Sequence, residues 1–289
     1  MSIKKLAVMT LMAFAAATPL RAQRVAAFQV ERTGHGRAMI LIPGLLSSGE
    51  VWRGTVERFR TDHELHVLTL AGFAGAPPTP AEPFLASTRD AIIQYIRDQR
   101  LDRPVLVGHS LGAFLALWIA ATAPELVGPV VAVDGVPYLA ALGDTTMTPA
   151  RARAQAEGLR TIYAGLSSEA LAAQTRLAMT QQVKDTVWHA VGARWGAASD
   201  AATAGRAVAE MLTTDIRREI ARIESPVLLF MAGDGLSPEQ RTTMRSRYAG
   251  QLAALPNARV VVAEHARHFV MLDDPAFFHT TMAAFLGGR

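Results

Sequence analysis

The sequence predicts an α/β protein with a mainly parallel sheet, helices on both faces of that sheet and a helical insertion before the penultimate strand. Short β-branched runs alternate with helical stretches in both halves of the chain, which is typical of strand–helix–strand units. Between residues 137 and 222 these runs stop, and Ala, Arg and Gln dominate. At 289 residues, 50% of them hydrophobic, the chain is long enough for one large domain with an insertion.

Apolar runs bounded by turn-forming residues predict the strands that precede the insertion. The runs cover 25–32, 38–42, 66–70, 104–107 and 129–133. Helices are expected between these strands, on the basis of apolar spacing and Ala/Leu content. They are a helix that Ser48 can cap and that runs through Trp52 and Phe59, a helix over 84–101 and a helix over 113–120.

After the insertion, Ser225-Pro226 breaks the helical pattern and the alternation of strand and helix resumes. The pattern predicts a strand over 227–231, a helix over 238–251 and a strand over 259–262. The last helix is expected to begin near Pro275, since Asp274 can cap it and proline suits a first helical turn.

The N-terminus has the features of a secretory signal peptide over residues 1–22. Lys4 and Lys5 form a basic start, and 6–17 is an apolar stretch too short to span a bilayer. The small residue Ala22 suits a cleavage site. We therefore expect export to the periplasm or secretion. No later stretch is long and apolar enough for a transmembrane helix, so no stable membrane span is expected after the signal is removed.

Charge and cysteine content exclude several classes of function. Without residues 1–22, which hold Lys4, Lys5 and Arg21 and no acidic residue, the formal charge falls from +4 to +1. Arginines are scattered rather than clustered, so a nucleic-acid partner is not indicated. The chain has no cysteine, which excludes disulfides, thiol catalysis and cysteine-based metal sites. Nothing indicates an oligomeric state.

The segment Gly108-His109-Ser110-Leu111-Gly112 reads G-x-S-x-G between a predicted strand and a predicted helix. Strand, sharp turn and helix form the context of a nucleophile elbow, in which the serine occupies the tight point of the turn. A plain Gly/Ser turn between two core elements is the alternative. We interpret Ser110 as a nucleophile.

A serine hydroxyl needs a base, and a histidine base needs a carboxylate to orient it. His268 follows the last predicted strand and precedes the last helix, at the sheet edge where open α/β sheets place their sites. His265 lies three residues earlier and is a weaker candidate. Asp234, directly after strand 227–231, is the expected acid. Asp134, at the end of the preceding strand, is the alternative acid.

An acyl-transfer reaction also needs two N–H donors for the oxyanion. The amide of Leu111, which follows the nucleophile, is expected to be one donor. The other is expected in the segment Pro43-Gly44-Leu45, where glycine permits a close approach of the backbone. We choose the amide of Leu45, with that of Leu46 as second choice.

With these motifs in order, the chain resembles the α/β-hydrolase superfamily, in its esterase and lipase-like branch with a helical cap. The similarity rests on four motifs and spans the chain from about Val25 to its end. The motifs are Pro43-Gly44-Leu45, the G-x-S-x-G elbow, Gly233-Asp234 and Arg267-His268-Phe269. Many members carry His where this chain has Pro43, and the turn at Asp234 is tighter than usual, which keeps Asp134 in contention.

The resemblance implies an α/β-hydrolase core over 23–136 and 223–289 and a cap over 137–222 that roofs the pocket. It implies an acyl-enzyme on Ser110, with no metal and no organic cofactor. Relatives that dehalogenate haloalkanes or open epoxides use Asp at the elbow, so the serine excludes those two reactions.

The substrate is the least readable property of the sequence. His109, Trp188 and Trp195 are expected to line the pocket, although the cap's aromatic and Met residues could equally form its own core. We favour a small to medium carboxylic ester with an apolar part. The alternatives are a serine hydrolase of a lactone, amide, thioester or C–C bond, a cofactor-free perhydrolase or haloperoxidase, and a non-catalytic ligand-binding relative.

Overall fold

The computed structural model describes residues 21–144 and 146–287. The expected signal peptide lies outside these residues except for Arg21 and Ala22, which begin strand β1 (Arg21–Val25). Cleavage after Ala22 would therefore shorten β1 at its start. Among the helices described, none combines the length and the apolar character needed to cross a membrane.

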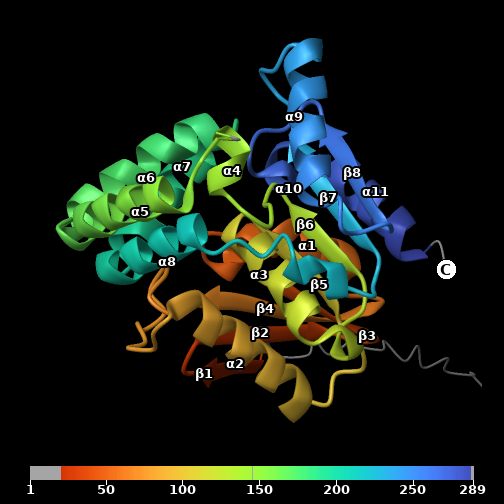
Figure 1. Ribbon diagram of the computed structural model, residues 1–289. Helices are drawn as coiled ribbons and strands as arrows, with labels where there is room; N and C mark the ends of the chain where they lie inside the picture. The colour runs from red at the N-terminus through yellow and green to blue at the C-terminus, as the bar shows by residue number, and fades with distance from the viewer. Residues whose placement is uncertain (1–20, 145, 288–289) are drawn as a thin grey trace, which may run out of the picture.

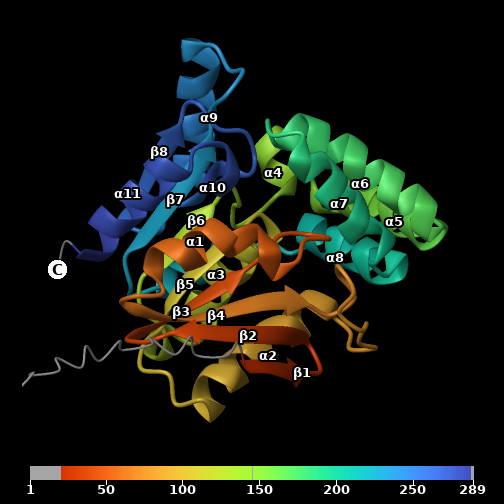
Figure 2. The same ribbon diagram turned by 180° about the vertical axis from the view of Figure 1, so that it is seen from behind.

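Within the described residues, eight strands form one sheet in the order β1-β2-β4-β3-β5-β6-β7-β8 (Figures 1 and 2). Strands β3 to β8 are mutually parallel, and β2 is antiparallel to both of its neighbours. The predicted mainly parallel sheet is therefore confirmed. The remaining bounds are β2 (Phe28–Gly34), β3 (Arg37–Ile42), β4 (His63–Leu70), β5 (Val105–His109), β6 (Val130–Val133), β7 (Val227–Ala232) and β8 (Ala258–Ala263).

The start of the sheet differs from the single strand predicted over 25–32. The chain instead forms a hairpin in which Val25 pairs with Phe28. The connection is Ala26-Ala27, which contains none of the Gly, Asn, Asp or Pro residues that mark tight turns in a sequence. The sequence pattern therefore gives no sign of the turn between the two strands.

Helices cover both faces of the sheet because its central strands are apolar on both sides. In β3, Ile40 and Ile42 belong to one hydrophobic core, and Met39 and Leu41 belong to the other. The first core is covered by α2 (Phe84–Asp98), α3 (Leu111–Thr122) and α9 (Pro238–Gln251). The second is covered by α1 (Arg53–Phe59), α10 (Val270–Asp273) and α11 (Pro275–Gly287).

Between β6 and β7 the described residues form five α-helices and a short 3-10 helix (Glu219–Arg222), as expected of the helical insertion. The α-helices are α4 (Ala140–Gly143), α5 (Pro149–Ala164), α6 (Ser168–Gln182), α7 (Val187–Ala197) and α8 (Ala201–Thr213). Helix α5 packs on α8, and α6 packs on α7. Both views show these helices grouped together beside the sheet, apart from α9 (Figures 1 and 2).

A buried histidine joins the sheet to α2. The side chain of His66 on β4 is fully buried, and its Nδ1 lies 2.8 Å from the hydroxyl of Tyr95 on α2. Its Nε2 lies 3.6 Å from a carboxylate oxygen of Glu64. Burial lowers the pKa of His66 to about 4, although the Glu64 carboxylate acts in the opposite direction. The folded protein therefore holds this ring in its neutral form.

We expect the free energy of unfolding to fall as the pH drops from about 6.5 toward 4. In that interval the unfolded chain binds a proton at His66, whose ordinary pKa is 6.5, and the folded chain does not. Stability rises with pH wherever the unfolded state binds more protons, so the contribution is complete above pH 6.5. Its size is roughly 3 kcal/mol, from the shift in pKa. Urea unfolding at pH 7, 6 and 5 measures it.

The control is His66→Gln, which keeps a polar side chain but removes the titrating group. The stability difference between the native protein and this variant should narrow as the pH falls. Other buried histidines and the carboxylates cancel in that difference. Parallel stability curves for the two proteins would contradict the prediction.

Candidate active site

The backbone at Ser110 forms a tight elbow between β5 and α3. Ser110 has φ 54°, in the left-handed region that non-glycine residues rarely adopt. A Cβ atom at Gly108 would lie 2.1 Å from the carbonyl oxygen of Gly112, and one at Gly112 would lie 2.2 Å from that of Ile42. Both positions therefore exclude any side chain. The amide of Ser110 donates to the carbonyl of Val133 at 2.8 Å, which ties the elbow to β6.

The segment expected to supply an oxyanion donor packs directly against the elbow. A Cβ atom at Gly44 would lie 3.3 Å from Ser110 Cβ and 2.8 Å from His109 Nδ1. Leu45 and Leu46 border the same cavity as Ser110. On the other side, Leu111 is the first residue of α3, where the helix offers its amide no carbonyl partner. The arrangement thus brings both chosen residues, Leu45 and Leu111, next to Ser110.

The carboxylate beside His268 belongs to Asp134. His268 Nδ1 donates to Asp134 Oδ2 at 2.7 Å. Since an ionised carboxylate only accepts, the proton sits on Nδ1, and Nε2 is the ring atom left free to act as a base. The structure does not place the expected acid, Asp234, beside His268, and the alternative, Asp134, occupies that position.

Asp134 is held by backbone and side-chain contacts around it. It follows β6 with φ 47°, and its amide donates to the carbonyl of Phe230 at 2.8 Å. Its side chain is 9% exposed. Oδ1 accepts from the amide of Ala232 at 3.0 Å and from the hydroxyl of Tyr248 at 2.8 Å. This leaves Oδ2 directed at His268.

Asp234 forms ion pairs with two basic side chains rather than with a histidine. Its carboxylate lies 2.8 Å from Lys184 Nζ and 3.3 Å from Arg267 Nε. The hydrogen bonds from Lys184 and then from Arg267 lower the pKa of Asp234 below its ordinary value. Lys184 follows α6, and Arg267 precedes His268. Asp234 therefore joins the insertion to the loop of the histidine, which is a structural contact and not the orienting contact of a triad.

His109, expected in the pocket, borders the cavity but is buried beneath the elbow. Its Nε2 donates to the carbonyl oxygen of His268 at 3.1 Å. Burial, and next the neighbouring His268 ring, lower the pKa of His109 well below its ordinary value. The ring is therefore neutral and supports the histidine loop. His265, the weaker candidate for the base, is exposed, and its carbonyl accepts from Lys184 Nζ.

Ser110 and His268 border both a cavity of about 160 Å³ and one of about 290 Å³. Gln182 and Met211 also border both. The smaller cavity is further lined by Leu45, Leu46, Ser47, His109, Tyr163, Gln174, Thr175, Ala178, Met179, Trp195 and Phe269. The larger one is further lined by Phe114, Asp134, Gly135, Val136, Leu139, Leu142 and Tyr248. The serine and the histidine thus lie where two mostly apolar spaces adjoin.

The two tryptophans expected in the pocket are placed differently. Trp195 on α7 borders the smaller cavity. Trp188 lies behind it, with ring centroids 5.8 Å apart, and borders neither of the two spaces next to Ser110. Trp188 therefore supports the wall of the pocket from outside.

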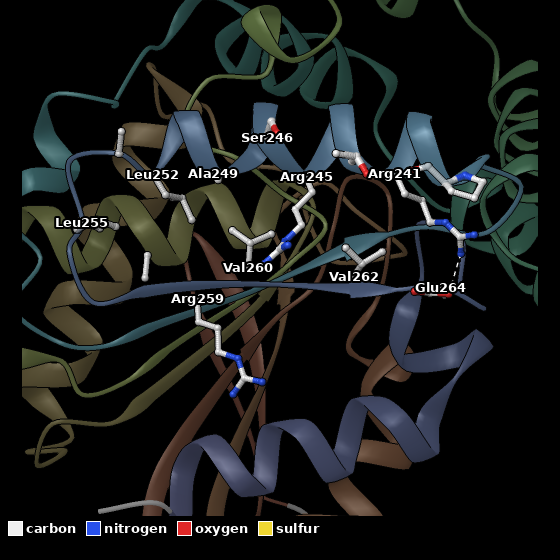
Figure 3. Close-up of a pocket in the computed structure, with 14 residues that line it drawn as sticks. Arg241, Arg245, Ser246, Ala249, Leu252, Leu255, Arg259, Val260, Val262 and Glu264 are labelled. Atoms are coloured by element: carbon white, nitrogen blue, oxygen red, sulfur yellow. Dashed lines mark hydrogen bonds and ion pairs between the residues drawn. The ribbon is translucent and has the colours of Figure 1, made fainter.

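A larger open groove of about 780 Å³ runs between α9 and β8 (Figure 3). Arg241, Arg245, Val260 and Val262 line it, and neither Ser110 nor His268 does. Across 21–144 and 146–287, no three His, Cys, Asp or Glu side chains are grouped closely enough to hold a metal ion.

The chain is similar in sequence to known proteins. Residues 39–280 match the alpha/beta hydrolase family. A pimeloyl-[acyl-carrier protein] methyl ester esterase of Nitrosomonas europaea is 25% identical over 262 residues, which cover 88% of this chain and 97% of that protein.

Solved structures show the same fold. A thermophilic esterase from Thermogutta terrifontis superposes with a TM-score of 0.71 at 15% identity, over 93% of this chain and 98% of that one. An enol-lactonase from Burkholderia xenovorans gives 0.71 at 16% identity, over 91% and 99%. With a family match over most of its length, the chain belongs to the alpha/beta hydrolase family of enzymes.

Proposed function

We propose that this protein is a serine hydrolase that cleaves carboxylic esters of small to medium size and largely apolar character through an acyl-enzyme. One observation supports this above all. Ser110, the strained elbow residue, and His268, which is bonded to Asp134, adjoin the same two cavities, and Asp134 borders the larger one. Nucleophile, base and orienting carboxylate are the groups that acyl transfer requires.

The chemistry follows from these positions. His268 Nε2 takes the proton of Ser110 as Oγ attacks the ester carbonyl carbon, and the carbonyl oxygen becomes an oxyanion. The amides of Leu45 and Leu111 would stabilise that oxyanion. The imidazolium then protonates the leaving alkoxide, and the C–O bond breaks. Water, deprotonated by the same nitrogen, releases the acid and restores Ser110.

The cavities favour a compact and mainly apolar substrate. Their volumes, about 160 and 290 Å³, are small, and aliphatic or aromatic side chains form most of their walls. On this proposal, the helices of 137–222 act as the cap that roofs both spaces. The similarity to a methyl ester esterase supports ester cleavage, without naming the natural ester.

We further infer that the protein is exported. The basic start and the short apolar stretch within residues 1–22 support this inference. Fractionation of cells that express the full chain, with sequencing of the mature N-terminus, tests it. An unprocessed N-terminus in the cytoplasmic fraction would contradict it.

Replacing either reacting side chain should abolish turnover. We expect Ser110→Ala and His268→Ala each to lower kcat by at least about 10⁴-fold, because members of a triad act as a unit. A p-nitrophenyl ester assay measures the loss, and a fluorophosphonate probe should label the native protein at Ser110. Near-native hydrolysis by either variant would contradict the mechanism. A folded native protein that resists the probe would favour the non-catalytic alternative.

The two aspartates should respond differently to the same substitution. Asp134→Asn can present an amide N–H to the ring and so favour the wrong tautomer, for which we expect kcat to fall by roughly 10³- to 10⁴-fold. Asp234→Asn removes part-exposed ion pairs, for which we expect kcat within about threefold of native and a stability loss of about 1 kcal/mol or less. A larger kcat loss for Asp234→Asn than for Asp134→Asn would reverse the assignment.

Substrate size should limit the rate. With p-nitrophenyl esters of increasing acyl length, we expect kcat/KM to fall once the chain outgrows the available space. Met211 lines both cavities, so Met211→Ala should enlarge them and shift the optimum to longer acyl chains. Lactones and amides of matched size should react more slowly than esters. Faster turnover of a lactone, or a strict need for peroxide, would favour the corresponding alternative function.

A further inference from the structure

Helix α9 presents different residues to its two sides. It begins after Ser237 with a capping box shared with Gln240, which fixes its first turn. Figure 3 shows the side that faces the groove along β8, with Arg241, Arg245, Ser246 and Ala249. The buried residues of the helix are Tyr248 and Gln251. Their side chains do not line the groove and instead contact Asp134 and Tyr138.

These buried residues contact the segment that carries Asp134. Gln251 binds the backbone of Tyr138 twice: its Oε1 accepts from the amide and its Nε2 donates to the carbonyl, each at 2.9 Å. Arg247 Nη1 donates to the carbonyl of Leu142 at 3.2 Å. Together with the bond from Tyr248 to Asp134, these contacts hold 134–142 along one side of α9.

We propose that Tyr248 is a positioning residue for the acid of the triad: its hydroxyl fixes the rotation of the Asp134 carboxylate so that Oδ2 faces His268. The hydroxyl and the amide of Ala232 both donate to Oδ1. A carboxylate held on one oxygen by two donors from different elements cannot rotate about its Cβ–Cγ bond without losing both. The catalytic consequence of this proposal rests on the proposed function.

The surroundings of Tyr248 suit this role. The residue is 5% exposed and borders the larger cavity beside Ser110, so its ring also forms part of the substrate wall. Burial, and next the Asp134 carboxylate, raise the pKa of Tyr248 well above its ordinary value. The hydroxyl is therefore protonated at neutral pH and able to donate. The backbone amide of Ala232 cannot be removed by a side-chain substitution, which makes Tyr248 the part of this arrangement open to mutation.

The test compares Tyr248→Phe with Ser246→Ala. The first variant removes only the hydroxyl and keeps the ring that fills the cavity wall. The second is a matched control on the exposed side of the same helix. Hydrogen bonds to charged groups are strong enough that we expect Tyr248→Phe to lower kcat about tenfold, with KM within about twofold. Ser246→Ala should match the native protein in both.

One further measurement separates positioning from a loss of stability. In proton NMR, the native protein should show a low-field resonance for the proton between His268 Nδ1 and Asp134 Oδ2. It should weaken or move in Tyr248→Phe and persist in Ser246→Ala.

An unchanged low-field proton in a folded Tyr248→Phe protein would overturn the proposal, even if the melting temperature falls. The NMR measurement does not depend on catalysis. A native protein that hydrolyses no ester, but whose low-field proton still responds to Tyr248→Phe, would therefore overturn the proposed function and support the role of Tyr248.

Discussion

The hydrogen bond between His268 and Asp134 is the interaction on which the candidate site depends. It joins residues 134 positions apart in the chain, at 2.7 Å. The bond can form because the parallel pairing of β6, β7 and β8 brings the carboxyl ends of these strands to one edge of the sheet. The elbow lies at the same edge because the amide of Ser110 binds the last residue of β6. The register of these strands thus fixes the positions of Ser110 and Asp134 together.

Much of this arrangement could be predicted from the chain. Unbroken β-branched runs revealed the parallel strands, since strands buried on both faces have no polar side to interrupt the pattern. The elbow was readable because a Cβ atom at Gly108 or Gly112 would clash with nearby backbone, so both positions need glycine and leave a visible motif. His268 was readable from its place after the last strand. These are local sequence patterns, which can be recognised without knowledge of the fold.

The choice of Asp134 over Asp234 and the contact with Tyr248 could not be predicted, because they depend on contacts between distant segments. Asp134 and Asp234 both follow neighbouring parallel strands, so position alone does not separate them. What separates them is that Lys184 and Arg267 bind Asp234, whereas Tyr248 and Ala232 bind Asp134. Nothing near Tyr248 in the sequence distinguishes it from an ordinary core tyrosine of a helix.

The loop of the histidine is bonded to the end of α6 as well as to the core. The amide of Phe269 donates to the carbonyl of Gln182 at 3.2 Å, and Arg267 donates to that of Thr180 at 3.0 Å. The amide of Lys184 donates to Asp273 at 2.8 Å. Moving the insertion at this corner would therefore break bonds on both sides of His268 and shift its ring relative to Ser110. Under the proposed function, the end of α6 would have to stay in place during turnover, and substrate would have to enter at another edge of the insertion.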